Sequence, residues 1–167
     1  MTAPNAPGLG GNGRPASWGT TVSVDRAPNK RRPIGLPLAG LHVLVADDDP
    51  DARDLFRLVL VYYGATVTIV TTARAALDAL QRVRADVVIT GLVREGSEDG
   101  VWLLGQARSR WPHVPFIATC QEQGDAELRA TVGFVECLIK PTQPELVVDA
   151  ILAAVGQPAL SQLRGQP

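Results

Sequence analysis

The stretch VLVADDDP at residues 43–50 decides the fold that we expect for this 167-residue chain. Four apolar residues end in three consecutive aspartates, and a proline follows at the first position of a helical pattern. Aspartate before proline is a favourable start for a helix, and apolar side chains of residues 50–63 then recur at spacings of three and four. The stretch therefore predicts a buried strand that leads into an amphipathic helix, with carboxylates at the junction.

Short apolar runs alternate with helical patterns five times beyond residue 40. The runs lack the in–out alternation of a strand with one wet face, so they are typical of a parallel sheet covered on both faces. The predicted strands are 41–46, 66–70, 86–90, 114–119 and 134–139, and the predicted helices are 50–63, 73–84, 100–110, 124–131 and 143–155. This order predicts a doubly wound α/β fold, in which functional groups gather beyond the carboxyl ends of the strands.

Composition and charge exclude several classes of protein. The chain carries a formal net charge of −1, which argues against nucleic acid as the main partner. It has no apolar stretch of the length a membrane helix needs, and its N-terminus has no secretory signal pattern. Its 2 cysteines are too few for a disulfide scaffold. We therefore expect a soluble, cytoplasmic, globular protein.

The chain divides into three parts by composition. Residues 1–38 are basic, rich in proline and glycine and without apolar periodicity, so we expect a disordered arm. Residues 39–156 hold all the predicted strands and helices, and we expect residues 157–167 to be a short flexible tail. This tail is too short for a DNA-binding output domain, so we expect a stand-alone module.

The residues that follow the predicted strands form a candidate pocket. Asp47 and Asp48 follow the first strand, Thr119 and Cys120 end the fourth, and Lys140 follows the fifth. Adjacent carboxylates suit Mg²⁺, which prefers oxygen ligands, and a lysine would pair with an anion beside the metal. The first strand is not followed by a glycine-rich loop, which disfavours a dinucleotide site.

Four stretches together resemble the receiver domain of bacterial two-component response regulators. They are VLVADDDP at 43–50, DVVIT at 86–90, DG at 99–100 and LIKP at 138–141, and the resemblance covers about residues 40–155. It implies a flavodoxin-like (CheY-like) fold with a five-stranded parallel sheet in the order 2-1-3-4-5 and five helices. In that family, a histidine kinase passes a phosphoryl group to an aspartate at the end of the third strand. The resemblance makes Asp47 and Asp48 the Mg²⁺-binding pair and Lys140 the lysine that contacts the phosphoryl group.

The sequence departs from the family pattern at three linked positions. Gly91 stands where the family has the acceptor aspartate, so no acyl phosphate can form there. Counting five residues from Pro115 puts Cys120 at the usual switch hydroxyl, with Thr119 one residue early and expected to face the opposite side. Cys137 replaces the aromatic residue that couples to the switch. The chain is therefore predicted to be a divergent pseudo-receiver that no longer runs the phosphorylation cycle.

These departures lead to expectations for the pocket. Without a third carboxylate, Asp47 and Asp48 should bind Mg²⁺ only weakly, and no cofactor should be required. Lys140 should pair with Asp47 or Asp48 and hold the pocket in one state. Cys120 and Cys137 lie on neighbouring predicted strands, where they are either a redox pair or, as we expect in a reducing cytoplasm, two small buried thiols.

The predicted function is phosphorylation-independent protein–protein interaction in bacterial signal transduction, without enzymatic activity. The partner would be another signalling protein, such as a histidine kinase, a regulator or an output protein, or a second copy in a homodimer. By the resemblance, contact is expected on the face of the fourth helix, fifth strand and fifth helix. Candidate contact residues are Val135, Glu136, Glu145, Val148 and Asp149.

Two alternatives remain open. The first is a working phosphorelay receiver with an unconventional acceptor such as Glu95 or Ser97. The second is a small enzyme or ligand sensor that binds an anion in the pocket of Asp47, Asp48, Thr119 and Lys140.

Overall fold

The structure is a computed structural model that describes residues 20–22, 36–92, 99–121 and 132–164. The described strands are β1 (Thr20–Val22), β2 (His42–Ala46), β3 (Thr66–Val70), β4 (Val87–Gly91), β5 (Phe116–Cys120) and β6 (Glu136–Ile139). The described helices are α1 (Pro50–Tyr62), α2 (Ala73–Leu80), α3 (Gly100–Ala107), α5 (Pro144–Ala154) and α6 (Leu160–Arg164). The helix predicted over 124–131 lies outside the described residues.

The strands form one sheet in the order β1-β3-β2-β4-β5-β6. All neighbouring pairs are parallel except β1 and β3, which are antiparallel. The order of the five parallel strands corresponds to 2-1-3-4-5 when they are counted along the chain, so the predicted flavodoxin-like topology is confirmed.

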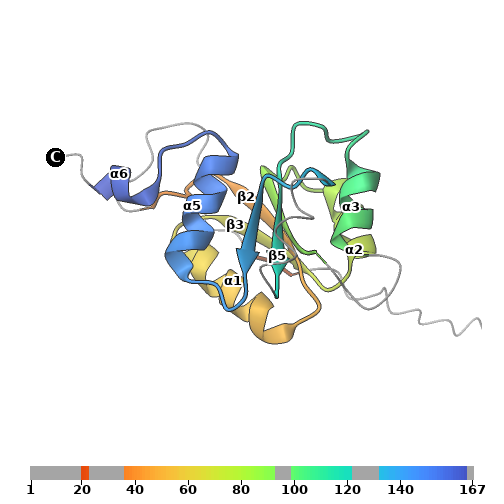
Figure 1. The fold of residues 1–167 in the computed structure, drawn as a ribbon, viewed down its shortest axis with the longest axis horizontal. Coiled ribbons are helices and arrows are strands. Elements are labelled where there is room, and N and C mark those ends of the chain that lie inside the picture. The colour runs from red at the N-terminus through yellow and green to blue at the C-terminus, as the bar shows by residue number, and fades with distance from the viewer. Residues whose placement is uncertain (1–19, 23–35, 93–98, 122–131, 165–167) are drawn as a thin grey trace, which may run out of the picture.

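Helices cover both faces of the sheet (Figure 1). On one face, Phe56 of α1 and Ile151 of α5 pack with alternate strand residues, including Ile117. On the other face, α2 and α3 pack against the remaining strand residues, including Leu44 and Phe116. Because both faces are covered, most positions of the parallel strands are apolar, which explains the apolar runs of the sequence.

Side chains at the helix starts satisfy backbone N–H groups that have no partner within the helix. The Asp49 carboxylate accepts a hydrogen bond from the Asp51 N–H at 3.0 Å, with Pro50 at the first turn of α1. The Asp99 carboxylate accepts one from the Trp102 N–H at 2.9 Å and begins α3. These caps fix where each helix leaves the carboxyl edge of the sheet.

The two ends of the described chain differ from the expected organisation. Residues 20–22 of the predicted arm form β1 on the outer edge of β3, whose backbone groups can pair with another strand. In the predicted flexible tail, Leu160 of α6 is buried in the core beside α5. The carboxylate of Asp149 accepts a hydrogen bond from the Leu160 N–H at 2.6 Å, which fixes the start of α6. Among the described helices, none combines the length and apolar character that crossing a membrane demands.

Candidate functional site: the pocket at the carboxyl edge of the sheet

The strand register places the pocket residues in one row. Ala46 pairs with Thr90, so Asp47 continues the register beside Gly91, and Gly91 pairs with Thr119. Directly paired residues of neighbouring strands direct their side chains to the same face of a sheet. A side chain at position 91 would therefore stand between those of Asp47 and Thr119.

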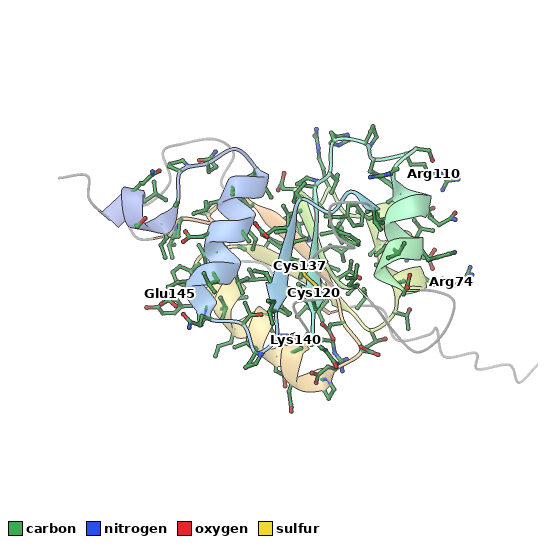
Figure 2. All side chains as sticks on the ribbon, in the orientation of Figure 1. Arg74, Arg110, Cys120, Cys137, Lys140 and Glu145 are labelled. Carbon is green, nitrogen blue, oxygen red and sulfur yellow. A yellow bond between two sulfur atoms is a disulfide. The ribbon has the colours of Figure 1, made fainter. Side chains whose placement is uncertain are left out.

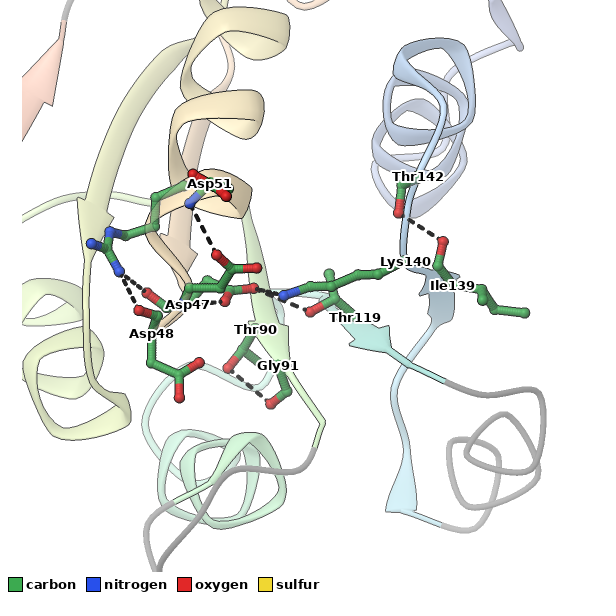
Figure 3. Close-up of polar contacts among 11 residues, drawn as sticks. Asp47, Asp48, Asp51, Thr90, Gly91, Thr119, Ile139, Lys140 and Thr142 are labelled. Atoms are coloured by element: carbon green, nitrogen blue, oxygen red, sulfur yellow. Dashed lines mark hydrogen bonds and ion pairs between the residues drawn. The ribbon is translucent and has the colours of Figure 1, made fainter.

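Asp47 is a buried carboxylate with a complete set of partners (Figure 3). Its Oδ1 accepts a hydrogen bond from the Asp49 N–H at 3.0 Å. Its Oδ2 forms an ion pair with the Lys140 ammonium at 2.7 Å and accepts a longer hydrogen bond from the Thr119 hydroxyl at 3.4 Å. Since a buried charge is tolerated only when it is paired and hydrogen-bonded, these contacts explain how Asp47 is accommodated at 1% exposure.

Lys140 extends from the end of β6 toward Asp47. Its backbone N–H donates to the Cys120 carbonyl at 2.8 Å, which continues the β5–β6 ladder by one residue. Beyond it, the Thr142 hydroxyl donates to the Ile139 carbonyl at 3.0 Å and closes the turn toward α5. The structure therefore confirms the predicted ion pair of Lys140 and identifies Asp47, rather than Asp48, as its partner.

Arg53 is a positioning residue that the sequence reasoning missed. One nitrogen of its guanidinium donates to the carbonyl oxygens of Asp47 at 3.0 Å and Asp48 at 2.7 Å. These bonds tie the first turn of α1 to the loop that presents Asp47. No spacing rule links an arginine at this position to two backbone carbonyls, so the sequence carried no signal for it.

Thr119 occupies a different place from the one expected. Its hydroxyl faces Asp47, whereas Cys120 packs in the core cluster on the α2 and α3 face. The count from Pro115 was wrong because it assumed a fixed distance from that proline to the end of the strand. The register of β5 against β4 decides instead, so the pocket keeps a hydroxyl beside Asp47.

The two cysteines form a disulfide, which contradicts the expectation of two separate buried thiols. Cys120 ends β5 and Cys137 lies in β6, with their Cα atoms 6.4 Å apart. Cys137 pairs with Ala118 in the register, so the two cysteines lie diagonally across neighbouring strands on the same face. The separate-thiol expectation rested on the redox state of the cytoplasm and not on the geometry of the strands.

The pocket residues that the structure describes do not offer a donor set that suits a resident Mg²⁺ ion. Oδ2 of Asp47 is held by the Lys140 ammonium, Asp48 is exposed, and Gly91 has no side chain. No group of three metal-ligating side chains occurs among the described residues. A cation would have to displace Lys140 from Asp47, so the weak Mg²⁺ binding expected at Asp47 and Asp48 remains only a prediction.

The backbone at Gly91 is closely covered by the start of α3. A Cβ atom added to Gly100 would collide with the Gly91 carbonyl oxygen, so only glycine permits this approach. The buried Thr90 hydroxyl donates to the same carbonyl oxygen at 3.4 Å. The candidate acceptors Glu95 and Ser97 lie outside the described residues.

The predicted partner face is only partly exposed. Val135 and Glu145 are exposed, and Glu136 is half-buried, with its carboxylate accepting a hydrogen bond from the Cys137 N–H at 2.9 Å. The expectation for Val148 is wrong, whereas Asp149 is half-buried like Glu136 and stays a prediction. Val148 is fully buried because α5 is apolar on most sides and turns this residue toward the core, and the Asp149 carboxylate bonds to α6. The exposed apolar side chains Ile139 and Leu146 were missed.

Comparison with known proteins gives consistent findings. The family model of the response regulator receiver domain matches residues 43–152. An uncharacterized 14.6 kDa protein from the sodA1 3' region of Leptolyngbya boryana is 36% identical over 113 residues, which cover 64% of this chain and 84% of that protein. The response regulator FleR of Pseudomonas aeruginosa is 34% identical over 125 residues, covering 74% of this chain. This chain spans only about a quarter of the length of FleR, since the match covers 25% of it.

Solved structures give the same fold. The chemotaxis protein CheY4 of Vibrio cholerae superposes with a TM-score of 0.63 at 24% identity, over 68% of this chain and 98% of that chain. The receiver domain of the Francisella response regulator 1452 superposes with a TM-score of 0.62 at 20% identity, over 70% of this chain and 97% of that chain.

Proposed function

Because this chain belongs to the response regulator receiver domain family of two-component signalling, we propose that it acts by phosphorylation-independent contact with another signalling protein. One observation carries the proposal: Gly91 occupies the place in the pocket row between Asp47 and Thr119. An acyl phosphate needs a carboxylate oxygen as its attachment point, and glycine supplies none.

The remaining charges of the pocket support the same proposal. Lys140 and Thr119 are the groups that could stabilise an anion, and both are bound to Asp47. Moving these two groups away from Asp47 would leave its buried carboxylate unpaired, which costs folding free energy. In the folded pocket, the positive charge of Lys140 and the negative charge of Asp47 therefore balance each other without a bound phosphoryl group.

The exposed apolar residues at the β6 edge support contact with a protein. Val135, Ile139 and Leu146 are between 40% and 53% exposed, and they come from the strand–helix segment where the family resemblance places partner contacts. Glu145 adds an exposed negative charge at the start of α5. This surface would bind another signalling protein, such as a kinase, a regulator or an output protein, or a second copy of the chain.

The two alternative functions gain no specific support. An unconventional phosphorelay acceptor would have to lie at Glu95 or Ser97, outside the described residues. An anion sensor would need Lys140 free to bind its ligand, but the ammonium is engaged by Asp47. Receiver domains are typically signalling domains without enzymatic activity, which agrees with the proposal.

The intact mass of the protein after incubation with acetyl phosphate and Mg²⁺ tests the proposal. We expect the natural protein to remain unmodified and the Gly91→Asp variant to gain one phosphoryl group, because the new carboxylate would face the row of Asp47 and Thr119. Gly91→Asn is the matched control, since its side chain has the same size but cannot form an acyl phosphate. A phosphoryl group on the natural protein would contradict the proposal and favour an unconventional acceptor.

A further inference from the structure

We propose that Cys120 and Cys137 form a reversible disulfide, exchanged with small thiols and disulfides, that controls the attachment of β6 and so the position of Lys140. The inference deepens the proposed function, on which it rests, because it supplies an input signal in place of phosphorylation. It starts from the place of the two cysteines relative to the pocket lysine.

The backbone geometry suits a disulfide that closes and opens without large movement of the strands. The Cα atoms are 6.4 Å apart, within the range of about 4.4–6.8 Å that disulfides span. Both residues belong to adjacent paired strands, so the hydrogen-bonded ladder brings the sulfur atoms together even when both are reduced. Figure 2 shows Cys120 and Cys137 joined between the two strands, with Lys140 farther along toward the pocket.

The two cysteine residues differ in burial, which gives the proposed exchange a direction. Cys137 is half-buried in β6, the outer strand of the described sheet, whereas Cys120 is 2% exposed in the core. An external thiol therefore reaches the Cys137 sulfur first. Cys120, enclosed by apolar neighbours on the α2 and α3 face, serves as the resolving partner.

The exchange balances as a two-electron reaction. A thiolate of an external dithiol attacks the Cys137 sulfur and breaks the protein disulfide, and Cys120 leaves as a thiolate that takes up a proton. The second thiol of the reductant then attacks the reductant's first sulfur, which is bonded to Cys137 in the mixed disulfide. This step releases the Cys137 thiol and leaves the reductant as a disulfide. In the oxidation, the Cys137 thiolate attacks a low-molecular-weight disulfide such as glutathione disulfide and releases one thiol. Cys120 then attacks the Cys137 sulfur in the mixed disulfide, which releases the second thiol and re-forms the protein disulfide.

The link to the pocket runs through Cys120 itself. Its carbonyl accepts a hydrogen bond from the Lys140 N–H, and its sulfur is bonded to Cys137. Cys120 is therefore joined both to β6 and to the residue that directly follows β6. Within the described chain, β6 has four residues and pairs with β5 alone. Without the disulfide, this short outer strand is held by its ladder hydrogen bonds, by the core packing of Leu138 and by the ion pair that Lys140 makes directly after it. A short strand with one neighbour in the sheet belongs to the less stable parts of a fold. Opening of β6 would draw Lys140 away from Asp47.

The first test counts thiols in the full chain across glutathione buffers. The protein is equilibrated from reducing to oxidising mixtures, its free thiols are trapped with an alkylating agent, and its intact mass is measured. We expect two alkyl groups at the reducing end, none at the oxidising end and one two-electron transition between them. The Cys137→Ser variant should retain one trapped thiol or one glutathione adduct. Two free thiols in every buffer, or a disulfide that persists in the folded protein at the reducing end, would overturn the proposal.

The second test measures hydrogen exchange of the oxidised and reduced protein. We expect the amides of β6 and of Lys140 to exchange about tenfold faster or more after reduction, with β2 and β3 unchanged. The Cys120→Ser/Cys137→Ser double variant should exchange at the fast rate in both buffers. Equal exchange of β6 in the two redox states would overturn the proposed control. Neither test uses a phosphodonor, so phosphorylation of the natural protein would refute the proposed function without affecting these results.

Discussion

The ends of β2 and β4 lie side by side at the carboxyl edge of the sheet, yet they differ completely in what they present. β2 is followed by Asp47, a buried carboxylate bound by a backbone N–H, an ammonium and a hydroxyl. β4 ends at Gly91, which has no side chain and whose carbonyl is covered by Gly100. The comparison shows how the pocket is held together with a glycine at position 91, because the remaining charges satisfy one another.

The largest expected effect on stability comes from removing the Asp47 carboxylate, on the β2 side of this comparison. Asp47→Ala leaves the Lys140 ammonium, the Thr119 hydroxyl and a backbone N–H without their acceptor. We expect the free energy of unfolding, measured by urea denaturation, to fall by about 2–4 kcal/mol.

Asp48→Ala is the matched control for Asp47→Ala. Asp48 is adjacent in sequence but exposed, so its removal should change the free energy of unfolding by less than about 0.5 kcal/mol. Equal losses in the two variants would show that the contacts of Asp47 do not stabilise the protein.

A smaller effect is expected on the β4 side, where the close approach of α3 to Gly91 can be tested. Gly100→Ala would force its new methyl group against the Gly91 carbonyl oxygen, and we expect a loss of about 1–3 kcal/mol in urea denaturation.

Gly105→Ala provides a control in the same helix with the opposite sign. A Cβ at Gly105 meets no atom within 4 Å, so alanine should stabilise α3 by about 0.5–1 kcal/mol through its higher helix propensity. A stabilising Gly100→Ala would contradict the described contact between α3 and β4.

The sequence predicted the parts of the fold that follow from burial and from local chain geometry. The five apolar runs identified the parallel strands because each is covered on both faces, and the run at 66–70 coincides with β3. Asp49 before Pro50 identified the start of α1, and the capping hydrogen bond is observed. The ion pair of Lys140 was predicted because the carboxyl ends of parallel strands meet at one edge.

Other features depend on tertiary contacts that no local pattern encodes. The face of α5 was misjudged at Val148 because a helix with apolar residues on most sides has no single apolar stripe. Thr119 was misplaced because one residue of register reverses the face of a strand side chain. The strand β1 pairs with β3 across many residues of sequence, and its three residues are too few to show a strand pattern.

A double-mutant cycle on Asp47 and Lys140 tests most directly the central claim that this ion pair holds the pocket together. The variants Asp47→Asn, Lys140→Met and their combination are compared in urea denaturation, with Asp48→Asn replacing Asp47→Asn in a control cycle. The account predicts a coupling free energy of about 1–2 kcal/mol between Asp47 and Lys140, and one near zero between Asp48 and Lys140. Additive effects of Asp47→Asn and Lys140→Met would contradict the account, because the observed 2.7 Å contact would then contribute nothing to the folded state.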